Sequence, residues 1–280
     1  MISQLTAGIY FSLPKAETDR PLLGLVSGRD AALMVDSGTS PGHAEEFLSA
    51  AGKNKTAPLK YQFLTHWHWD HVFGIPRVGA ECIAHELTAA KLREMRGQPW
   101  NNAGLDKMVE NGIMSPFNAE CLRREMPNEA ERIIGPVDRQ FTDTLEIDLG
   151  ELHCLIEHIG GTHTEDSSVL FVPEQKVLFP GDCIYGRRIN GEYGYRLEEL
   201  IQMTEKLRSY DAEYFLVSHE EPMKRDEFFS ELDRMIDIGK LVGEETEYER
   251  AAESFRKKNR QTPTEEEAQI IQMFTGPNKK

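Results

Sequence analysis

Three histidines and an aspartate, residue types that bind transition metals, occupy four of six consecutive positions in the segment THWHWDH: His66, His68, Asp70 and His71. The apolar run Tyr61–Leu64 predicts a short buried strand that leads into them. At a strand end, side chains two residues apart point to the same side, so His66 and His68 can converge on one metal ion. The turn that follows would carry Asp70 and His71 to a neighbouring point. Imidazole nitrogens with a carboxylate suit zinc, and also iron or manganese.

Three more candidate ligands follow at predicted strand ends. His163 stands in GGTHTEDS, where Gly160 and Gly161 allow a tight turn. Asp182 stands in FPGDC and His219 in LVSH. Taken singly, each is typical of a turn or a helix cap. Their order and their placement at strand ends, together with the first cluster, indicate one shared site.

These motifs resemble the pattern of the metallo-β-lactamase superfamily, which is His-x-His-x-Asp-His followed by a His, an Asp and a His. The resemblance covers roughly residues 1–222. It implies an α/β layered fold, a four-layer αββα sandwich with the site at one edge of the two sheets. It also implies the ligands: His66, His68 and His163 for one metal, Asp70, His71 and His219 for a second, and Asp182 bridging both.

The resemblance implies hydrolysis as the chemistry. Two divalent cations, partly neutralised by Asp70 and Asp182, would stabilise a bridging hydroxide, because a bound metal lowers the pKa of water from about 15.7 to about 7. We expect two zinc ions, with iron or manganese as alternatives. Asp70 is also expected to be catalytic, by orienting the hydroxide or carrying a proton.

The subfamilies suggest the substrate class. Lactonases that open acyl-homoserine lactones place a tyrosine three residues after the bridging aspartate, and Tyr185 stands at that spacing. Its phenol could hydrogen-bond a substrate carbonyl or a developing alkoxide, although aromatic packing explains it equally well. Thioesterases of the glyoxalase II kind share the seven ligands. The prediction is a small ester, lactone, thioester or amide as substrate, with Tyr185 as a second catalytic candidate.

Three other functions stay open. True zinc β-lactamases usually replace the bridging aspartate, often by cysteine, whereas here Asp182 is present and Cys183 follows it. The segment HTEDS still resembles the lactamase version of its motif. A mononuclear iron oxidoreductase of the persulfide dioxygenase type would use fewer of the ligands on the same fold. A metal-binding protein without turnover is the third alternative.

Residues around the ligands are expected to support or line the site. Asp36 stands where the superfamily has a buried aspartate that supports the metal loop, although a turn aspartate is a nearly equal interpretation. Trp67 and Trp69 are expected to form walls of the site, and Trp100 to cover it. Apolar packing in the core is the alternative for all three.

Runs of apolar residues, separated by glycine and proline, predict the elements that position these side chains. Strands are predicted at 9–13, 22–27, 31–35, 61–64, 145–149, 152–158, 168–172, 176–179 and 214–218, with helices at 41–51 and about 196–209. Between about 86 and 135 the pattern changes to short helices, which predicts a helical insertion.

We therefore predict a metallo-β-lactamase-like catalytic domain over residues 1–222, with the insertion at about 86–135, and a helical C-terminal extension over 223–280. Apolar residues three and four apart, such as Phe228, Leu232 and Met235, predict an amphipathic helix there. Packing on the catalytic domain is its default role. Covering the pocket, or contacting a second subunit in a homodimer, are the alternatives.

Composition limits the partners. The formal net charge of −15 opposes binding of nucleic acid or an anionic membrane, so a small-molecule substrate is the expected partner. No stretch of the sequence approaches the roughly 18 apolar residues of a membrane helix, and no secretory signal is recognisable. The four cysteines are widely spaced and predict reduced thiols in a cytoplasmic protein.

Overall fold

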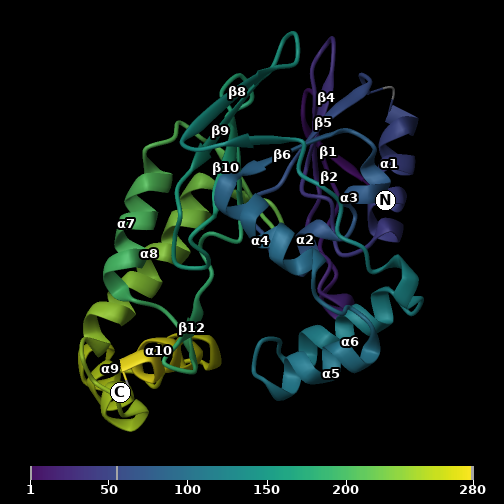
Figure 1. Ribbon diagram of the computed structural model, residues 1–280. Coiled ribbons are helices and arrows are strands. Elements are labelled where there is room, and N and C mark those ends of the chain that lie inside the picture. The colour runs from purple at the N-terminus through teal and green to yellow at the C-terminus, as the bar shows by residue number, and fades with distance from the viewer. Residues whose placement is uncertain (1, 55, 279–280) are drawn as a thin grey trace.

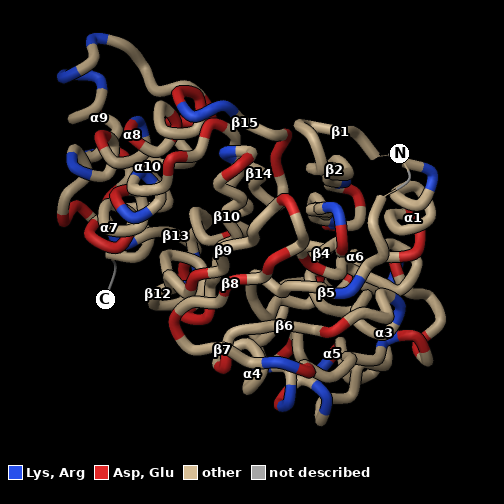
Figure 2. The backbone as a smooth tube through the Cα atoms, turned by 90° about the horizontal axis from the view of Figure 1, so that it is seen from above, with Lys and Arg blue, Asp and Glu red and all other residues tan. Residues whose placement is uncertain are grey.

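Two β-sheets lie face to face, with helices on their outer faces, in the computed structural model, which describes residues 2–54 and 56–278 (Figure 1). Figure 2 shows the same layers from above, with α1 and α3 outside one sheet and α7 and α8 outside the other. The predicted α/β layered αββα architecture is therefore confirmed.

The first sheet has its strands in chain order, antiparallel from β1 to β4 and parallel from β4 to β7. Its strands are β1 (Ser3–Thr6), β2 (Ile9–Phe11), β3 (Gly24–Ser27), β4 (Ala32–Val35), β5 (Leu59–Phe63), β6 (Glu81–His85) and β7 (Arg139–Phe141). Strand β6 was not predicted. It is only five residues long and runs directly into α4, so its sequence can equally be interpreted as the beginning of that helix.

The second sheet has the order β15-β14-β11-β10-β9-β8, and β11 and β14 are parallel neighbours. Its strands are β8 (Thr144–Asp148), β9 (His153–His158), β10 (Ser168–Val172), β11 (Val177–Gly181), β14 (Tyr214–Val217) and β15 (Met223–Lys224). A separate hairpin, β12 (Arg187–Ile189) with β13 (Glu192–Gly194), leaves the sheet after β11 and was not predicted.

The helices follow the predicted pattern more closely than the strands do. They are α1 (Pro41–Ala51), α2 (Trp69–Val72), α3 (Ile75–Val78), α4 (Glu86–Arg96), α5 (Asn102–Glu110), α6 (Pro116–Glu125), α7 (Leu197–Arg208), α8 (Arg225–Val242), α9 (Tyr248–Asn259) and α10 (Glu265–Asn278). Single 3₁₀ turns lie at Ala16–Thr18, Gly52–Asn54 and Glu129–Glu131. Helix α1 has the predicted bounds because Ser40 caps it, accepting a hydrogen bond from the His43 amide at 2.9 Å, and Pro41 begins it.

The core between the sheets consists of buried aliphatic and aromatic side chains from both, including Leu33, Phe63, Leu170 and Phe179. A second apolar cluster joins the outer face of the second sheet to α7–α10, where Phe228 of α8 stacks on Phe215 of β14 with ring centroids 4.1 Å apart. The C-terminal helices thus cover that face of the sheet. The division into a catalytic domain over residues 1–222 and a helical extension over 223–280 stays a prediction.

The insertion helices α4–α6 enclose an apolar cluster of their own beside α2. All four cysteines are free and buried, as expected of reduced thiols. Within the described residues, no helix combines the length and the apolar character that crossing a bilayer requires.

Candidate metal centre

Seven side chains from five segments of the chain converge beyond the carboxyl ends of β5, β11 and β14. His66 and His68 lie in the loop after β5, and Asp70 and His71 lie on α2. The others are His163 in the loop between β9 and β10, Asp182 directly after β11, and His219 after β14. Strand β5 ends at Phe63, so His66 and His68 converge from the loop and not, as expected, from the strand itself.

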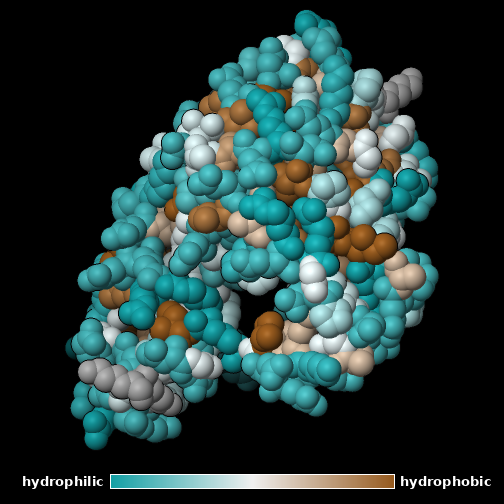
Figure 3. Space-filling view, in the orientation of Figure 1, coloured by the Kyte–Doolittle hydropathy of each residue, from teal (hydrophilic) through white to brown (hydrophobic). Residues whose placement is uncertain are grey.

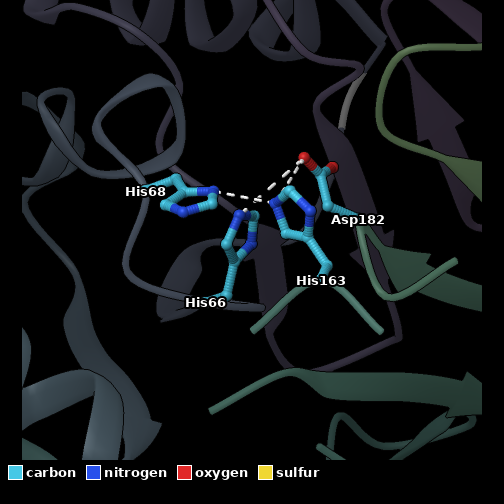
Figure 4. Close-up of side chains that lie close together, drawn as sticks. All are labelled: His66, His68, His163 and Asp182. Atoms are coloured by element: carbon cyan, nitrogen blue, oxygen red, sulfur yellow. Dashed lines mark hydrogen bonds and ion pairs between the residues drawn. The ribbon is translucent and has the colours of Figure 1, made fainter. Parts of the chain in front are cut away.

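The first group joins three histidines to a carboxylate: His66, His68, His163 and Asp182 offer ligand atoms that all lie within 4.8 Å of one another (Figure 4). Nε2 of His163 lies 2.8 Å from Nδ1 of His68 and 3.6 Å from Oδ2 of Asp182. On its other side, Nδ1 of His163 lies 2.9 Å from the carbonyl oxygen of Gly186. Because a carbonyl can only accept, Nδ1 carries the proton and the Nε2 lone pair faces the group.

The second group shares Asp182 with the first and adds Asp70, His71 and His219, again with ligand atoms within 4.8 Å of one another. Nε2 of His71 lies 3.0 Å from Oδ2 of Asp70 and 3.5 Å from Oδ1 of Asp182. Nε2 of His219 lies 3.2 Å from the same Asp70 oxygen and 3.4 Å from Oδ2 of Asp182. Asp182 therefore presents Oδ2 to both groups, to His163 and to His219, and Oδ1 to His71 of the second group.

Asp36 orients two of the histidines from behind. Its Oδ2 lies 2.9 Å from Nδ1 of His71, and its carboxylate accepts hydrogen bonds from the Thr65 amide at 2.8 Å and the Thr65 hydroxyl at 2.9 Å. The Thr65 oxygen lies 3.1 Å from Nδ1 of His66. Both Nδ1 atoms thus meet acceptors, which leaves both Nε2 lone pairs directed into the site. The structure supports the interpretation of Asp36 as a residue that holds the metal loop.

Charge differs between the two groups. Burial and neighbouring imidazoles hold the pKa of His66 well below its usual range and that of His68 at about 3, so both rings are neutral ligands. Burial acts in the same direction on His219, but Asp182 and Asp70 outweigh it and raise its pKa to about 11. Asp70 and Asp36 raise the pKa of His71 as well. The carboxylates of the second group therefore attract positive charge, which protons or a cation can supply.

The donor set fits divalent metals on a further observation. Nε2 of His66, Nε2 of His71 and Oδ1 of Asp182 are buried, and although carboxylate oxygens lie 3.8 Å and 3.0 Å from the two nitrogens, none of the three atoms forms a well-aligned hydrogen bond within the described residues. Buried polar atoms without a partner are costly, and a bound cation is a common reason for them. Imidazole nitrogens with carboxylate oxygens suit zinc, iron and manganese alike.

Five of the seven side chains lie at the floor of a cavity of about 950 Å³, namely His68, Asp70, His163, Asp182 and His219, whereas His66 and His71 are fully buried and do not line it. Trp67, Trp69 and Trp100 line it, as the sequence predicted, and they also belong to the apolar cluster of the insertion, so both interpretations hold together. The indole N–H of Trp100 donates to the Met95 carbonyl at 2.8 Å. Figure 3 shows the surface hollowed between the α5–α6 side and the α9–α10 side.

The opposite wall belongs to the hairpin β12–β13, which contributes Arg187, Arg188 and Tyr193. The guanidinium group of Arg187 donates two hydrogen bonds, one to Glu199 of α7 at 2.8 Å and one to the Thr162 carbonyl at 2.9 Å. Helix α10 supports the hairpin from behind. A Cβ atom on Gly194 would lie 1.9 Å from a backbone oxygen of α10, so only glycine permits this approach.

Tyr185 also lines the cavity, and its ring centroid lies 6.3 Å from that of His163 and 5.9 Å from that of His219. Its hydroxyl is buried without a hydrogen-bond partner in the described parts of the chain. Burial and the Asp182 carboxylate hold its pKa well above the usual range, so the phenol keeps its proton and remains a donor.

Asp19, which was not among the predicted site residues, lines the cavity, with its Oδ1 3.8 Å from Nδ1 of His219. Burial and the nearby Asp70 raise the pKa of Asp19 to about 6. It was missed because it stands in a loop between β2 and β3, far from every metal-ligand motif. Thr65 was missed as well, although its place directly before His66 was a usable signal.

Two mixed β-sheets that pack face to face, with a His/Asp cluster at the strand ends that can hold a metal, are typical of a class of metal-dependent hydrolases. Residues 22–219 match the sequence profile of the Metallo-beta-lactamase superfamily, and this chain belongs to that superfamily.

Individual relatives are distant. A linear primary-alkylsulfatase of Pseudomonas sp. is 21% identical over 238 residues, which are 75% of this chain but 43% of that protein, so the chain spans less than half of its length. A metallo-beta-lactamase from Pontibacter korlensis is 20% identical, with a TM-score of 0.58 over 83% of this chain and 97% of that one. A metallo-beta-lactamase family protein from Thermus thermophilus is 16% identical, with a TM-score of 0.58 over 98% and 92%.

Proposed function

We propose that the protein is a dinuclear metal-dependent hydrolase of a small ester, lactone, thioester or amide. One ion would be held by His66, His68 and His163, the second by Asp70, His71 and His219, and Asp182 would bind both. The observation that carries this proposal is Asp182, since its Oδ2 lies 3.6 Å from Nε2 of His163 while its Oδ1 lies 3.5 Å from Nε2 of His71. Zinc is the expected metal, with iron or manganese as alternatives.

When bound, the two ions would lower the pKa of a water molecule and polarise the bond to be cleaved. Asp70 would accept a proton in the cavity and deliver it to the leaving group, because its carboxylate lines the cavity. The Tyr185 hydroxyl, a donor without a partner among the described residues, would hydrogen-bond the oxygen that gains negative charge.

The relatives widen the range of substrates to be tested. The alkylsulfatase adds sulfate esters, and the lactamases add cyclic amides. A small molecule is the proposed partner, since a net charge of −15 opposes nucleic acid and anionic membranes. Four free, buried cysteines are consistent with the proposed cytoplasmic location.

The main competing function is a mononuclear iron oxidoreductase. It would leave the second group without a role, whereas that group holds two carboxylates and two histidines at ligand spacing. Metal analysis of protein prepared with zinc, iron and manganese distinguishes the two. Two equivalents per chain are expected, and one equivalent of iron with oxygen consumption would contradict the dinuclear proposal.

The direct test is Asp182→Asn, which keeps the size of the side chain and removes its charge. We expect loss of at least one metal equivalent and of hydrolysis across a panel of esters, thioesters, lactones, sulfate esters and β-lactams. Asp19→Asn is the matched control, because Asp19 lines the same cavity outside both ligand groups. It should keep both equivalents. Full metal loading and activity in the Asp182→Asn variant would overturn the proposal.

A further inference from the structure

The outer part of the cavity exposes apolar side chains to an unusual degree. Among the described residues, large hydrophobic side chains are exposed at seven positions: Leu13, Leu87, Ile113, Phe117, Ile133, Leu155 and Tyr193. Three of these, Ile113, Phe117 and Tyr193, line this one cavity. Single exposed apolar residues are ordinary, but a group of them around one cavity is typical of a surface that a ligand covers.

These three side chains belong to two different walls. Ile113, 73% exposed, follows α5, and Phe117, 56% exposed, lies in the first turn of α6. Tyr193 lies on β13, in the opposite wall. The hollow between these walls is the one visible in Figure 3.

The apolar surface continues from the rim to the floor. Besides Phe117, the cavity is lined by Met95, Met108, Met114, Trp100 and Trp67, and the Trp67 ring lies against His68 with centroids 4.5 Å apart. Three of these are methionines, whose flexible side chains adapt to apolar groups of different shape. The wall therefore suits a chain or ring of variable size.

On the insertion side of the cavity the charged lining residues are Lys91 and Glu94, while Asp19, Arg187, Arg188 and Glu220 line other parts of it. Lys91 lies 3.1 Å from Glu94, and Arg187 forms its ion pair with Glu199. Arg188 donates to the Gly191 carbonyl at 3.1 Å. The side of the cavity formed by the insertion thus favours an uncharged, apolar ligand group, since its two charged residues form a pair with each other.

We infer that the insertion wall, from Trp67 to Phe117, binds an apolar chain or ring of the substrate, whose hydrolysable head lies at the floor. The substrate class is then an amphiphile, such as an ester with a long acyl chain. This inference rests on the proposed function for the head group, but the apolar subsite can be tested without it.

The first measurement is kcat/KM for 4-nitrophenyl esters from acetate to decanoate, with zinc-loaded protein. Each methylene that is fully buried should raise kcat/KM about fourfold, and a half-buried one about twofold. We expect the rise to continue to at least the octanoate. Hydrolysis that does not depend on chain length would overturn the inference and leave the proposed function standing.

Variants locate the subsite. Ile113→Ser and Phe117→Ser should flatten the dependence on chain length, so that the ratio of kcat/KM for the octanoate to kcat/KM for the acetate falls below that of wild type. Ile133→Ser is the matched control, because Ile133 is 60% exposed in the same insertion but does not line this cavity. All three side chains are exposed, so their loss spares the core. Equal flattening by Ile133→Ser would overturn the assignment.

A second readout needs neither metal nor turnover. Calorimetric titration of the metal-free protein with 1-octanol and 1-butanol should show at least about tenfold tighter binding of octanol, since four more methylenes can be buried. Ile113→Ser and Phe117→Ser should lose this preference, and Ile133→Ser should keep it. Octanol selectivity without hydrolysis of any ester would refute the proposed function alone. Absence of the selectivity from wild type would refute the apolar subsite.

Discussion

The floor of the cavity and its walls are built in opposite ways. In the metal centre at the floor, the side chains of His66 and His71 are at most 1% exposed, and the far nitrogen of each meets an acceptor, Thr65 or Asp36. At the walls, Ile113 in the turn after α5 and Phe117 in the first turn of α6 line the cavity as exposed side chains, and the opposite hairpin is held by the Arg187–Glu199 pair and by α10.

This difference separates two tasks. Metal binding needs ligand atoms held to within a few tenths of an ångström, which only buried, fully hydrogen-bonded side chains provide. The free energy of binding an apolar group depends on the apolar area that is buried and not on precise atom positions. Exposed side chains on less rigid segments are therefore sufficient. We therefore expect substitutions at the floor to act on metal binding and stability, and those at the walls to act on substrate range.

Asp36→Asn should have the largest effect on metal binding. Asn tolerates the positive φ of 57° at this position, so the backbone is preserved, but its amide group cannot accept from both His71 and Thr65. Loss of such a partner typically weakens metal binding about 10- to 100-fold. Competition with a chromogenic zinc chelator measures this loss. Binding as tight as in wild type would show that the loop orients its ligands without Asp36.

Gly181→Ala should have the largest effect on stability, because the backbone of Gly181 lies close against the Thr65 side chain at the floor. Gly181 has a φ of +59°, and a Cβ atom would lie 2.7 Å from Cβ of Thr65. We expect the free energy of unfolding to fall by about 2–4 kcal/mol, from backbone strain of about 1–2 kcal/mol together with overpacking. Urea unfolding of the metal-free protein measures it.

Gly79→Ala is the control for Gly181→Ala. Its φ is +68°, but nothing lies within 4 Å of its Cβ position, so only the strain of about 1–2 kcal/mol applies. Equal losses in the two variants would mean that the contact between Gly181 and Thr65 contributes nothing.

Glu125→Gln tests the contacts that attach helix α6 of the insertion wall to the start of α1. The Glu125 side chain is 4% exposed and accepts from Arg20 at 2.6 Å and from the Ser40 hydroxyl at 2.6 Å, which joins α6 to the start of α1. Arg20 keeps its second partner, Glu46. Because one ion pair of two is lost, we expect a destabilisation of about 2–3 kcal/mol at pH 7, below the usual cost of a fully buried pair.

The effect of Glu125→Gln should depend on pH. Burial opposes ionisation of Glu125, but the hydrogen bonds from Arg20 and Ser40 outweigh it and hold its pKa below the ordinary 4.5. The stabilisation is therefore present above about pH 4.5 and is lost as the pH falls through the pKa of the folded state. Urea unfolding of wild type and of the Glu125→Gln variant should give a smaller difference in the free energy of unfolding at pH 3.5 than at pH 7. Glu120→Gln, in an exposed pair with Arg124, is the control and should change little.

Much of the floor could be predicted from the sequence because its signals are short and chemical. His66, His68, Asp70 and His71 stand together, and His219 follows an unambiguous apolar run. Helix α1 was predictable for the same reason, since Ser40 and Pro41 mark its start locally. Where residue type and local spacing carry the information, the fold adds the geometry.

The walls could not be predicted because their cause is not local. Strands β12 and β13 are polar segments that exist as a hairpin through pairing with each other and through the close approach of α10 to Gly194. Nothing near Asp19 in the sequence indicates that its loop returns to His219. Likewise, Ile113 stands in a polar turn, and only the tertiary arrangement shows that it lines the cavity.

Glu199→Gln should have the smallest effect and tests whether the hairpin wall is as loosely held as its exposure indicates. The Arg187 and Glu199 side chains are 33% and 34% exposed, so water screens their ion pair, and Arg187 retains its hydrogen bond to the Thr162 carbonyl. We expect a loss below about 1 kcal/mol, smaller again in about 0.5 M salt because the pair is screened further. Glu198→Gln, one residue earlier on α7, is the control for changing the charge of the helix. A loss of several kcal/mol specific to Glu199→Gln would place the hairpin with the floor as a rigid part of the site, and substrate range would then be expected to depend on the insertion wall alone.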